Sequence, residues 1–386
     1  MNTQELIKIE DDYFINTFTR QPVILDHGEG VKVTDIDGNE YIDMFAGIAV
    51  NALGHNHPKL VKAIQDQAKK LIHVSSIYYN EPALIYAKRL VDLTSFDRIF
   101  YANSGAEANE GAIKLAVKYT GKSEVISTVD SFHGRTIMTL AATGHEEYHE
   151  PFKAVMPQGF INVPYNDIEA IKEAITENTA AIIVEPIQGE GGVNVPDIEY
   201  LKEIEKICHE KDIVFIVDEV QTGFGRCGKL FAHELFDVKP DIMTMAKGIG
   251  GGVPMGAILA TEKVAGAFVP GDHGTTFGGG PLVCAAANAI LDAFEEENIL
   301  DNVNEVGDYF ISELKKLDKE VIADVRGKGL MVGLELTEPG AKYVDKLREK
   351  GFLINCTADK VLRFVPPLII TKEEIDQFVK ALDETL

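Results

Sequence analysis

Short, uninterrupted runs of apolar residues constrain the fold of this chain more than any other feature of its sequence. The segments AAIIV (180–184) and IVFIV (213–217) have an apolar side chain at every position. Such strands are favoured where helices cover both faces of a sheet, because a half-exposed strand alternates apolar and polar residues. Runs of this kind alternate with helical patterns, which predicts an α/β fold with a large mixed or mainly parallel sheet.

The same periodicity assigns individual elements. Residues 31–44 alternate in polarity around Asp37 and Gly38, which is typical of a β-hairpin with a tight turn. Helices are predicted over 58–71, 82–93, 106–119, 197–211 and 281–296. Strands are predicted over 98–102, 124–129, 180–185, 213–217, 241–245 and 256–260.

Two structural units are expected from this order of elements. Residues 58–295 carry the alternating pattern and are predicted to form a large α/β domain. The C-terminal residues 296–386 change to helix, strands, helix, strand and helix, and Thr371 and Glu374 have the spacing of a capping box for the last helix. We expect this part to form a smaller α+β domain, to which the N-terminal segment 1–57 contributes.

Composition excludes several classes of function. The 386 residues carry a net charge of −24, so neither a nucleic-acid nor an anionic-membrane partner is expected, since phosphates need a basic surface. No apolar run approaches the ~20 residues of a transmembrane helix, and the first residues lack a secretory-signal pattern. The four cysteines form no CxxC pair, which fits a reducing cytoplasm and predicts neither disulfides nor a zinc site.

Other patterns resemble ligand-binding motifs without the residues that such motifs need. GFGRCG (223–228) fits GxGxxG, but Glu234 comes too soon to be the acidic residue of a dinucleotide fold. The same loop also resembles a phosphate-binding loop, but such a loop needs a magnesium-binding hydroxyl at the position where this chain has Leu230. His55 and His57 have no further ligand at matching spacing, so a glycine-histidine turn is favoured over a metal site.

Two residues that follow predicted strands have complementary chemistry. Asp218 ends the strand IVFIV, and ligands of open α/β sheets bind beyond the carboxyl ends of strands. A carboxylate there could keep a pyridine nitrogen protonated, although an isolated strand-end aspartate can equally cap the next element. Lys247 follows the next strand and precedes a glycine-rich bend. Most single lysines are solvated, but a desolvated one has a lowered pKa that favours imine formation.

A third segment offers an anion site. Strand 98–102 leads through Asn103-Ser104-Gly105-Ala106 into a helix, whose first N–H groups and positive dipole end suit a phosphate. Ser104 can act as the N-cap of the same helix, and the two roles are compatible. Together, the three segments predict a site for pyridoxal 5′-phosphate.

The motifs of the chain resemble those of the class III aminotransferases, which are pyridoxal-phosphate enzymes of fold type I. The resemblance covers most of the sequence. It is carried by FAGIAVNALGHNHP (45–58), NSGAEAN (103–109), SFHGRT (131–136), VEPIQGEGG (184–192), DEVQTGFGRCG (218–228), AKGIGGGVPMGA (246–257), HGTTFGG (273–279) and RFVPPLII (363–370). One departure is visible: the family commonly has asparagine where this chain has Gly280.

The resemblance implies a role for each matching residue. Lys247 is then the catalytic residue and holds the cofactor as a Schiff base. The cofactor-binding set implied by the family is Gly105, Ala106, Phe132, Asp218, Glu219, Val220, Gln221, Lys247 and Thr276. Thr276 is expected to reach the phosphate of a neighbouring subunit, so that a homodimer shares its active sites. The substrate-binding set is Arg135, Glu190, Thr275 and Arg363, and no metal is expected.

The resemblance also implies an activity. Glu190 is expected to neutralise Arg363 when an ω-amine is bound and to release it for the second carboxylate of 2-oxoglutarate. The expected donor is N2-acetyl-L-ornithine, which would yield N-acetyl-L-glutamate 5-semialdehyde in arginine biosynthesis. Ornithine, 4-aminobutyrate and an N-acyl-lysine are alternative donors. An aminomutase of the same fold and a catalytically silent binding or regulatory protein are weaker alternatives.

Overall fold

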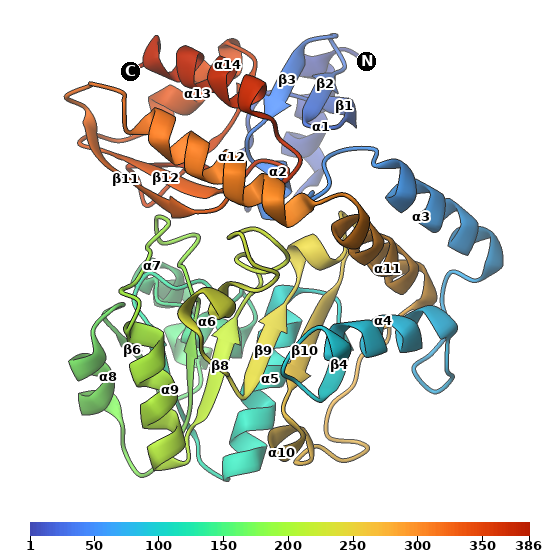
Figure 1. The fold of residues 1–386 in the computed structure, drawn as a ribbon, viewed down its shortest axis with the longest axis vertical. Helices are drawn as coiled ribbons and strands as arrows, with labels where there is room; N and C mark the ends of the chain where they lie inside the picture. Colours follow the sequence, from blue (N-terminus) through green and yellow to red (C-terminus); the bar gives the residue numbers. More distant parts are fainter.

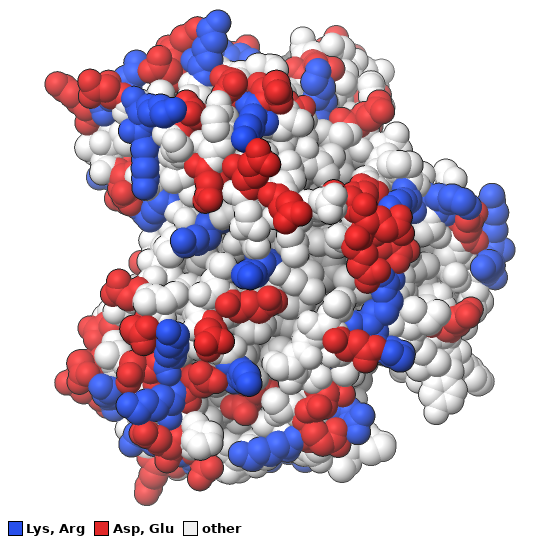
Figure 2. All heavy atoms as spheres, in the orientation of Figure 1, with Lys and Arg blue, Asp and Glu red and all other residues white.

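The computed structural model describes residues 1–386. The middle of the chain surrounds one large sheet, and both chain termini lie in a smaller region at the opposite end of the molecule (Figure 1). No helix is long and apolar enough to cross a membrane. Acidic and basic side chains are interspersed over the face seen in Figure 2.

The large sheet has seven strands in the order β4-β10-β9-β8-β7-β5-β6. β10 pairs antiparallel with both of its neighbours, and the remaining pairs are parallel, so the predicted mixed, mainly parallel sheet is confirmed. The strands span Arg98–Ala102 (β4), Glu124–Thr128 (β5), Phe160–Val163 (β6), Thr179–Val184 (β7), Val214–Asp218 (β8), Ile242–Met245 (β9) and Gly256–Ala260 (β10). Every residue of β7 and β8 is buried, as their uninterrupted apolar sequences predict.

Helices cover both faces of this sheet. They span Pro58–Lys70 (α3), Glu81–Asp92 (α4), Gly105–Thr120 (α5), Ile137–Ala142 (α6), Glu146–His149 (α7), Ile168–Ala174 (α8), Tyr200–Lys211 (α9), Glu262–Ala265 (α10) and Pro281–Glu296 (α11). Short 3-10 turns span Glu150–Val155 (η1), Ala232–Phe236 (η2) and Lys247–Ile249 (η3). All five predicted helices are present. α9 begins three residues later than predicted, because Tyr200 N–H closes a turn onto Asp197 O at 3.0 Å.

The smaller region contains two four-stranded sheets, β1-β2-β3-β13 and β11-β12-β15-β14. Their strands span Leu25–Glu29 (β1), Lys32–Asp35 (β2), Glu40–Asp43 (β3), Ile322–Lys328 (β11), Met331–Leu336 (β12), Phe352–Leu353 (β13), Asn355–Thr357 (β14) and Val361–Phe364 (β15). The helices span Thr3–Tyr13 (α1), Ala46–Ala49 (α2), Ile299–Leu314 (α12), Ala341–Glu349 (α13) and Lys372–Asp383 (α14).

The chain ends are joined within the first of these small sheets. β2 and β3 form the predicted antiparallel hairpin, and β13 from the C-terminal part pairs in parallel with β3. The predicted capping box of α14 is also present: Thr371 and Glu374 each accept the other's backbone N–H. The N-terminal strands therefore share a sheet with a strand from near the C-terminus.

Candidate active site

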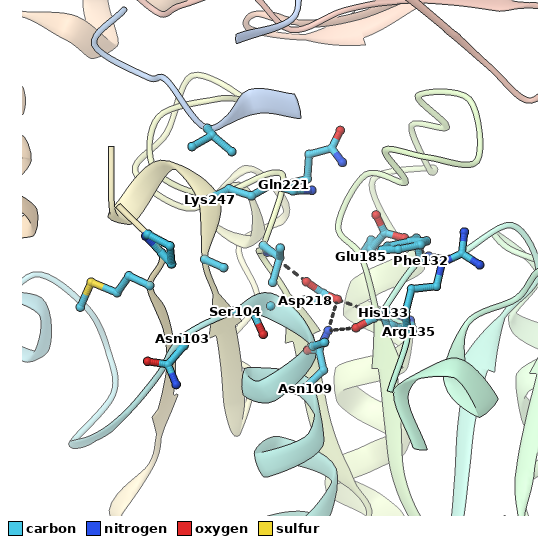
Figure 3. A pocket seen from close by; sticks show the side chains of 18 of the residues that line it. Asn103, Ser104, Asn109, Phe132, His133, Arg135, Glu185, Asp218, Gln221 and Lys247 are labelled. Atoms are coloured by element: carbon cyan, nitrogen blue, oxygen red, sulfur yellow. Dashed lines mark hydrogen bonds and ion pairs between the residues drawn. The ribbon is translucent and has the colours of Figure 1, made fainter. Parts of the chain in front are cut away.

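A cavity of about 470 Å³ opens at the carboxyl ends of β8 and β9. Its walls come from the β4–α5 turn, the segment after β5, the end of β8 and the turn η3 (Figure 3). Eight of the predicted residues line it: Gly105, Ala106, Phe132, Arg135, Asp218, Val220, Gln221 and Lys247. Residues from four separate segments thus meet where an open α/β sheet binds its ligand.

Asp218 is held by a buried hydrogen-bond network. Its Oδ2 lies 2.7 Å from Nδ1 of His133 and accepts from Nδ2 of Asn109, also at 2.7 Å, while Oδ1 accepts from Val220 N–H at 3.0 Å. Thr244 Oγ1 donates to Oδ1 of Asn109 at 2.6 Å, which turns the amide NH₂ group toward Asp218. Three partners therefore hold the Asp218 carboxylate in the wall of the cavity, and one of them, the Val220 N–H, is the local contact expected of a capping aspartate.

Lys247 begins the turn η3 and has a left-handed backbone with φ of 48°. Burial lowers the pKa of its ammonium group, while Glu190 opposes this shift and Arg363 adds to it. A lysine with a lowered pKa has a larger fraction of the neutral amine that attacks carbonyl carbons. The predicted desolvation of Lys247 is thus present in the structure.

The start of α5 offers the predicted phosphate cradle. Ser104 Oγ accepts from Glu107 N–H at 3.2 Å, which leaves the first amides of Gly105 and Ala106 without a partner inside the helix. A Cβ on Gly105 would lie 2.8 Å from Cγ1 of Val220, so only glycine lets the backbone approach that side chain here. Both proposed roles of Ser104 and this helix start are therefore compatible, as expected.

Glu190 and Arg363 form an ion pair beside the cavity. Nη1 of Arg363 lies 2.6 Å from Oε1 of Glu190 and donates to Oε1 of Gln221 at 3.1 Å, and Gln221 Nε2 donates to Glu190 at 3.2 Å. Although burial opposes it, Arg363 and then Lys247 hold the pKa of Glu190 below its ordinary value. The Arg363 side chain is only 1% exposed. A charge buried to this degree needs its partner, because an unpaired one is costly.

Phe132 and Arg135 lie on the opposite side of the cavity from Lys247 and Gln221 (Figure 3). The Arg135 guanidinium stacks on Tyr148, 3.6 Å from the ring centroid, and forms no ion pair within the chain. An exposed guanidinium without a carboxylate partner can accept the carboxylate of a ligand through two parallel hydrogen bonds.

Besides Glu190 and Arg363, three more predicted residues are not part of the cavity lining: Glu219, Thr275 and Thr276. The Glu219 carboxylate contacts His233 Nδ1 at 3.0 Å and accepts from Thr222 Oγ1 at 2.5 Å. Thr275 and Thr276 line a second cavity of about 630 Å³ on the outer side of the β4–α5 turn. Thr275 Oγ1 accepts from Asn103 Nδ2 at 3.0 Å. Asn103 lines both cavities and so connects them.

Gly280 has no side chain to replace the asparagine that is common in the family. The loop backbone is instead held by Asn80. Asn80 Nδ2 donates to Gly279 O at 2.9 Å, and Gly280 is the N-cap residue of α11. His55 and His57 contact different carboxylates, Asp43 at 2.9 Å and Glu297 at 3.1 Å, so the pair do not face one site.

The sequence did not single out four residues that complete the site. These are Asn109, His133, Thr244 and Glu185. Asn109 lies one helical turn after Gly105, and His133 lies next to Phe132, so proximity to predicted residues was the available signal. Glu185 joins two segments, since its two carboxylate oxygens accept from Phe132 N–H at 2.9 Å and Gly189 N–H at 3.0 Å.

A family model and curated relatives match the chain over nearly its whole length. The family described as Aminotransferase class-III matches residues 15–386. The acetylornithine aminotransferase of Methanothermobacter thermautotrophicus is 52% identical over 388 residues, covering 100% of this chain and 99% of the relative. That of Methanocaldococcus jannaschii is 53% identical over 392 residues, covering 100% and 98%.

Solved structures share the whole fold. An ornithine aminotransferase from Toxoplasma gondii superposes with a TM-score of 0.96 at 33% identity, covering 100% of this chain and 95% of that one. An acetylornithine aminotransferase from Elizabethkingia anophelis gives 0.89 at 36% identity, covering 100% and 99%.

The chain belongs to the class III aminotransferase family and has the fold type I architecture. It is an enzyme that moves an amino group from an amine donor to a keto acid, and its cofactor is pyridoxal 5′-phosphate. The residues present suit this cofactor: Asp218 for the ring nitrogen, Lys247 for the aldehyde and the Gly105–Ala106 amides for the phosphate.

Proposed function

We propose that this enzyme transfers the terminal amino group of N2-acetyl-L-ornithine to 2-oxoglutarate. The products are N-acetyl-L-glutamate 5-semialdehyde and L-glutamate, as arginine biosynthesis requires. The observation that carries the proposal is the full-length similarity, at 52% and 53% identity, to two proteins named acetylornithine aminotransferase. The buried pair of Glu190 and Arg363 beside Lys247 supports an ω-amine donor.

Each lining residue has a distinct task in this reaction. The bound cofactor supplies an aldehyde carbon and an electron-withdrawing ring. Lys247 would hold the cofactor through that carbon, and its amine, once replaced there by the substrate amine, would move the proton from the substrate carbon that bears the amine. Asp218, fixed by His133 and Asn109, keeps the proton on the ring nitrogen. Phe132 and Val220 line the cavity and would pack on the two faces of the ring.

The substrate carboxylates are assigned to two arginines. Arg135, at the mouth of the cavity, binds the carboxylate of the acetylornithine donor through two hydrogen bonds. The donor brings no second carboxylate, so Glu190 stays paired with Arg363 at 2.6 Å. 2-Oxoglutarate brings one, and Glu190 then gives way to it. Gln221 contacts both members of the pair and is assigned to the cofactor's 3-hydroxyl oxygen.

The active enzyme is proposed to be a cytoplasmic homodimer with shared sites. Thr276 is exposed, and the neighbouring Phe277 side chain has 63% of its surface exposed. The segment 77–79 exposes Ile77, Tyr78 and Tyr79, and Phe277 lies near it, with its ring 5.2 Å from that of His73. Apolar surface of this kind marks a protein contact. Thr276 would then contact the cofactor phosphate of the partner, Thr275 the substrate, and Glu219 the cofactor region from behind Asp218.

The donor is tested by separate half-reactions with purified, cofactor-loaded enzyme. N2-acetylornithine, ornithine, 4-aminobutyrate and N2-acetyl-lysine are each mixed with the enzyme without keto acid, and the change in cofactor absorbance is followed. We expect the highest kcat/KM for N2-acetylornithine, and no reaction of any donor with Lys247→Ala. A higher value for ornithine, the substrate named for the Toxoplasma gondii structure, would replace the proposed donor.

A further inference from the structure

The loop that carries Glu190 has a strained backbone. It follows β7 and contains Gly192 with φ of 113° and Val193 with φ of 56°. A β-branched residue at positive φ is a genuine outlier, and such strain persists only where surrounding contacts impose it. The Val193 side chain is fully buried, so the conformation is enforced by packing and by polar contacts from the smaller region.

Arg326 on β11 supplies those polar contacts. Its Nη2 donates to Gly192 O at 2.7 Å, and its Nε donates to Gly192 O and Val193 O, both at 3.1 Å. The third nitrogen, Nη1, pairs with Asp324 at 3.1 Å and with Glu335. Asp324 and Glu335 therefore hold one side of the guanidinium against the small sheet. The other side, Nε and Nη2, donates to the carbonyl oxygens of Gly192 and Val193.

Arg326 and Arg363 lie in one row across the small sheet. Gly333 on β12 is the register partner of Arg326 on β11 and of Arg363 on β15. Side chains in the same row of adjacent strands point to the same face. A Cβ on Gly333 would lie 3.0 Å from Cβ of Val193, so the loop packs directly over the glycine between the two arginines.

The loop is thus held on both sides by one row of the sheet. Arg326 binds its backbone at Gly192 and Val193, and Arg363 binds the Glu190 carboxylate at 2.6 Å. Thr357 Oγ1 also donates to Glu190 O. The hydrogen bonds from Arg326 to the loop backbone begin only two residues after Glu190. They therefore limit how far the Glu190 carboxylate can move relative to Arg363.

We propose that Arg326 is a positioning residue for substrate selection: it fixes the strained loop so that Glu190 neutralises Arg363 for donors with one carboxylate. The inference rests on the proposed exchange between Glu190 and the second carboxylate of the keto acid. Without the hydrogen bonds from Arg326 to the loop backbone, the Glu190 carboxylate is away from Arg363 for a larger fraction of the time. A donor with one carboxylate then meets an uncompensated buried cation, whereas L-glutamate brings its own counter-ion.

The test compares the two half-reactions in the cofactor-loaded enzyme. For Arg326→Met, we expect the ratio of kcat/KM for N2-acetylornithine to kcat/KM for L-glutamate to fall about tenfold, the size of a lost hydrogen bond to a charged group. Arg326→Lys keeps one donor and is expected to lose about threefold, a partial rescue. Asp324→Asn keeps an oxygen that can accept from Nη1 of Arg326 and does not contact the loop, so its ratio is expected to match that of the wild type.

The outcomes separate this inference from the proposed function. A wild-type enzyme that reacts with glutamate but not with N2-acetylornithine contradicts the proposed donor, and the ratio is then taken with the ω-amine that does react. An equal loss in both half-reactions for Arg326→Met and Arg326→Lys would make Arg326 purely structural and overturn the inference. If the methionine variant does not fold, the lysine variant alone decides: an unchanged ratio overturns the inference.

Discussion

The Nδ1 atom of His133 lies 2.7 Å from Oδ2 of Asp218, and both side chains are almost completely buried. Asn109 donates to the same oxygen at 2.7 Å. Two short contacts on one carboxylate oxygen fix its direction and stabilise its negative charge. The direction in which the Asp218 carboxylate points therefore depends on His133 and Asn109.

Removing His133 is expected to weaken the enzyme without removing the reaction. His133→Phe should lower kcat about 10- to 100-fold, the range of one hydrogen bond to a charged group. It should also raise the Kd of the cofactor, measured by absorbance titration of the apoenzyme. His57→Phe is the matched control, because His57 is also buried beside a carboxylate, Glu297, but lies outside the cavity. Equal effects of the two variants would contradict the prediction.

Thr244 is expected to act one step further from the cofactor. Thr244→Val keeps the shape of the side chain but removes the donor to Asn109 Oδ1, which leaves a buried acceptor unpaired. Such a loss costs about 1–3 kcal/mol. We expect a lower free energy of unfolding by that amount and a several-fold lower kcat, since the Asn109 amide can then turn away from Asp218. Urea unfolding and half-reaction rates measure both effects, and a stable variant with unchanged kcat would contradict the prediction.

The sequence predicted the large sheet well because its signal is local. Mainly apolar runs mark buried strands, and six of the seven strands were predicted from them. β6 was not predicted; it is an edge strand of the sheet, and three of its four residues are only partly buried. The parallel pairing of β13 with β3 was also not predicted, since the two strands lie about 310 positions apart and no local pattern encodes their contact.

The site was predictable only where a residue follows a strand or matches a family motif. Asp218 and Lys247 stand at strand ends, and Arg135 lies in a motif. His133 and Asn109 also lie in such motifs, but their role was not predicted, because their contacts with Asp218 join residues 85 and 109 positions apart and no spacing rule encodes them. The role of Arg326 could not be predicted for the same reason, because it depends on the register of three strands and on a strained loop elsewhere in the chain.

Glu185 is expected to give the protein a measurable pH dependence. Burial raises its pKa from the ordinary value of 4.5 to about 7, and the nearby Asp218 adds to the rise against the opposing effect of His133. Because the folded-state pKa lies above the unfolded one, this stabilisation is complete below about 4.5 and is lost as the pH rises through 7.

Glu185→Gln does not titrate, so its stability relative to the wild type should rise between pH 5 and pH 8. The change is expected to be on the order of 1–3 kcal/mol in the free energy of unfolding. At pH 5 the variant should be less stable, because an amide nitrogen cannot accept the N–H of Phe132 or Gly189. Urea unfolding at both pH values, with the exposed Glu199→Gln as control, measures the difference. If the difference in the free energy of unfolding between the variant and the wild type did not change with pH, the raised pKa of Glu185 would be contradicted.

Shared active sites make a prediction about mixed dimers. If Lys247 of one subunit works with Thr276 of its partner, Lys247→Ala and Thr276→Ala are each expected to lower the activity of their homodimers. A dimer with one chain of each kind has one site that lacks both side chains and one that has both. This mixed dimer can be purified through a different affinity tag on each chain. It should have about half of the wild-type activity per dimer.

Arg135 supplies the control for this complementation, because it lines the same cavity as Lys247 of its own chain. A dimer of Lys247→Ala and Arg135→Ala chains has one defect in each site, so neither site is complete and no recovery is expected. Recovery in both mixed dimers would point to exchange of subunits or contamination with wild type. Full activity of the Thr276→Ala homodimer, or no recovery with Lys247→Ala, would overturn the shared site. Thr276 is exposed and lines a different cavity of its own chain, as a residue that acts in the site of a partner must.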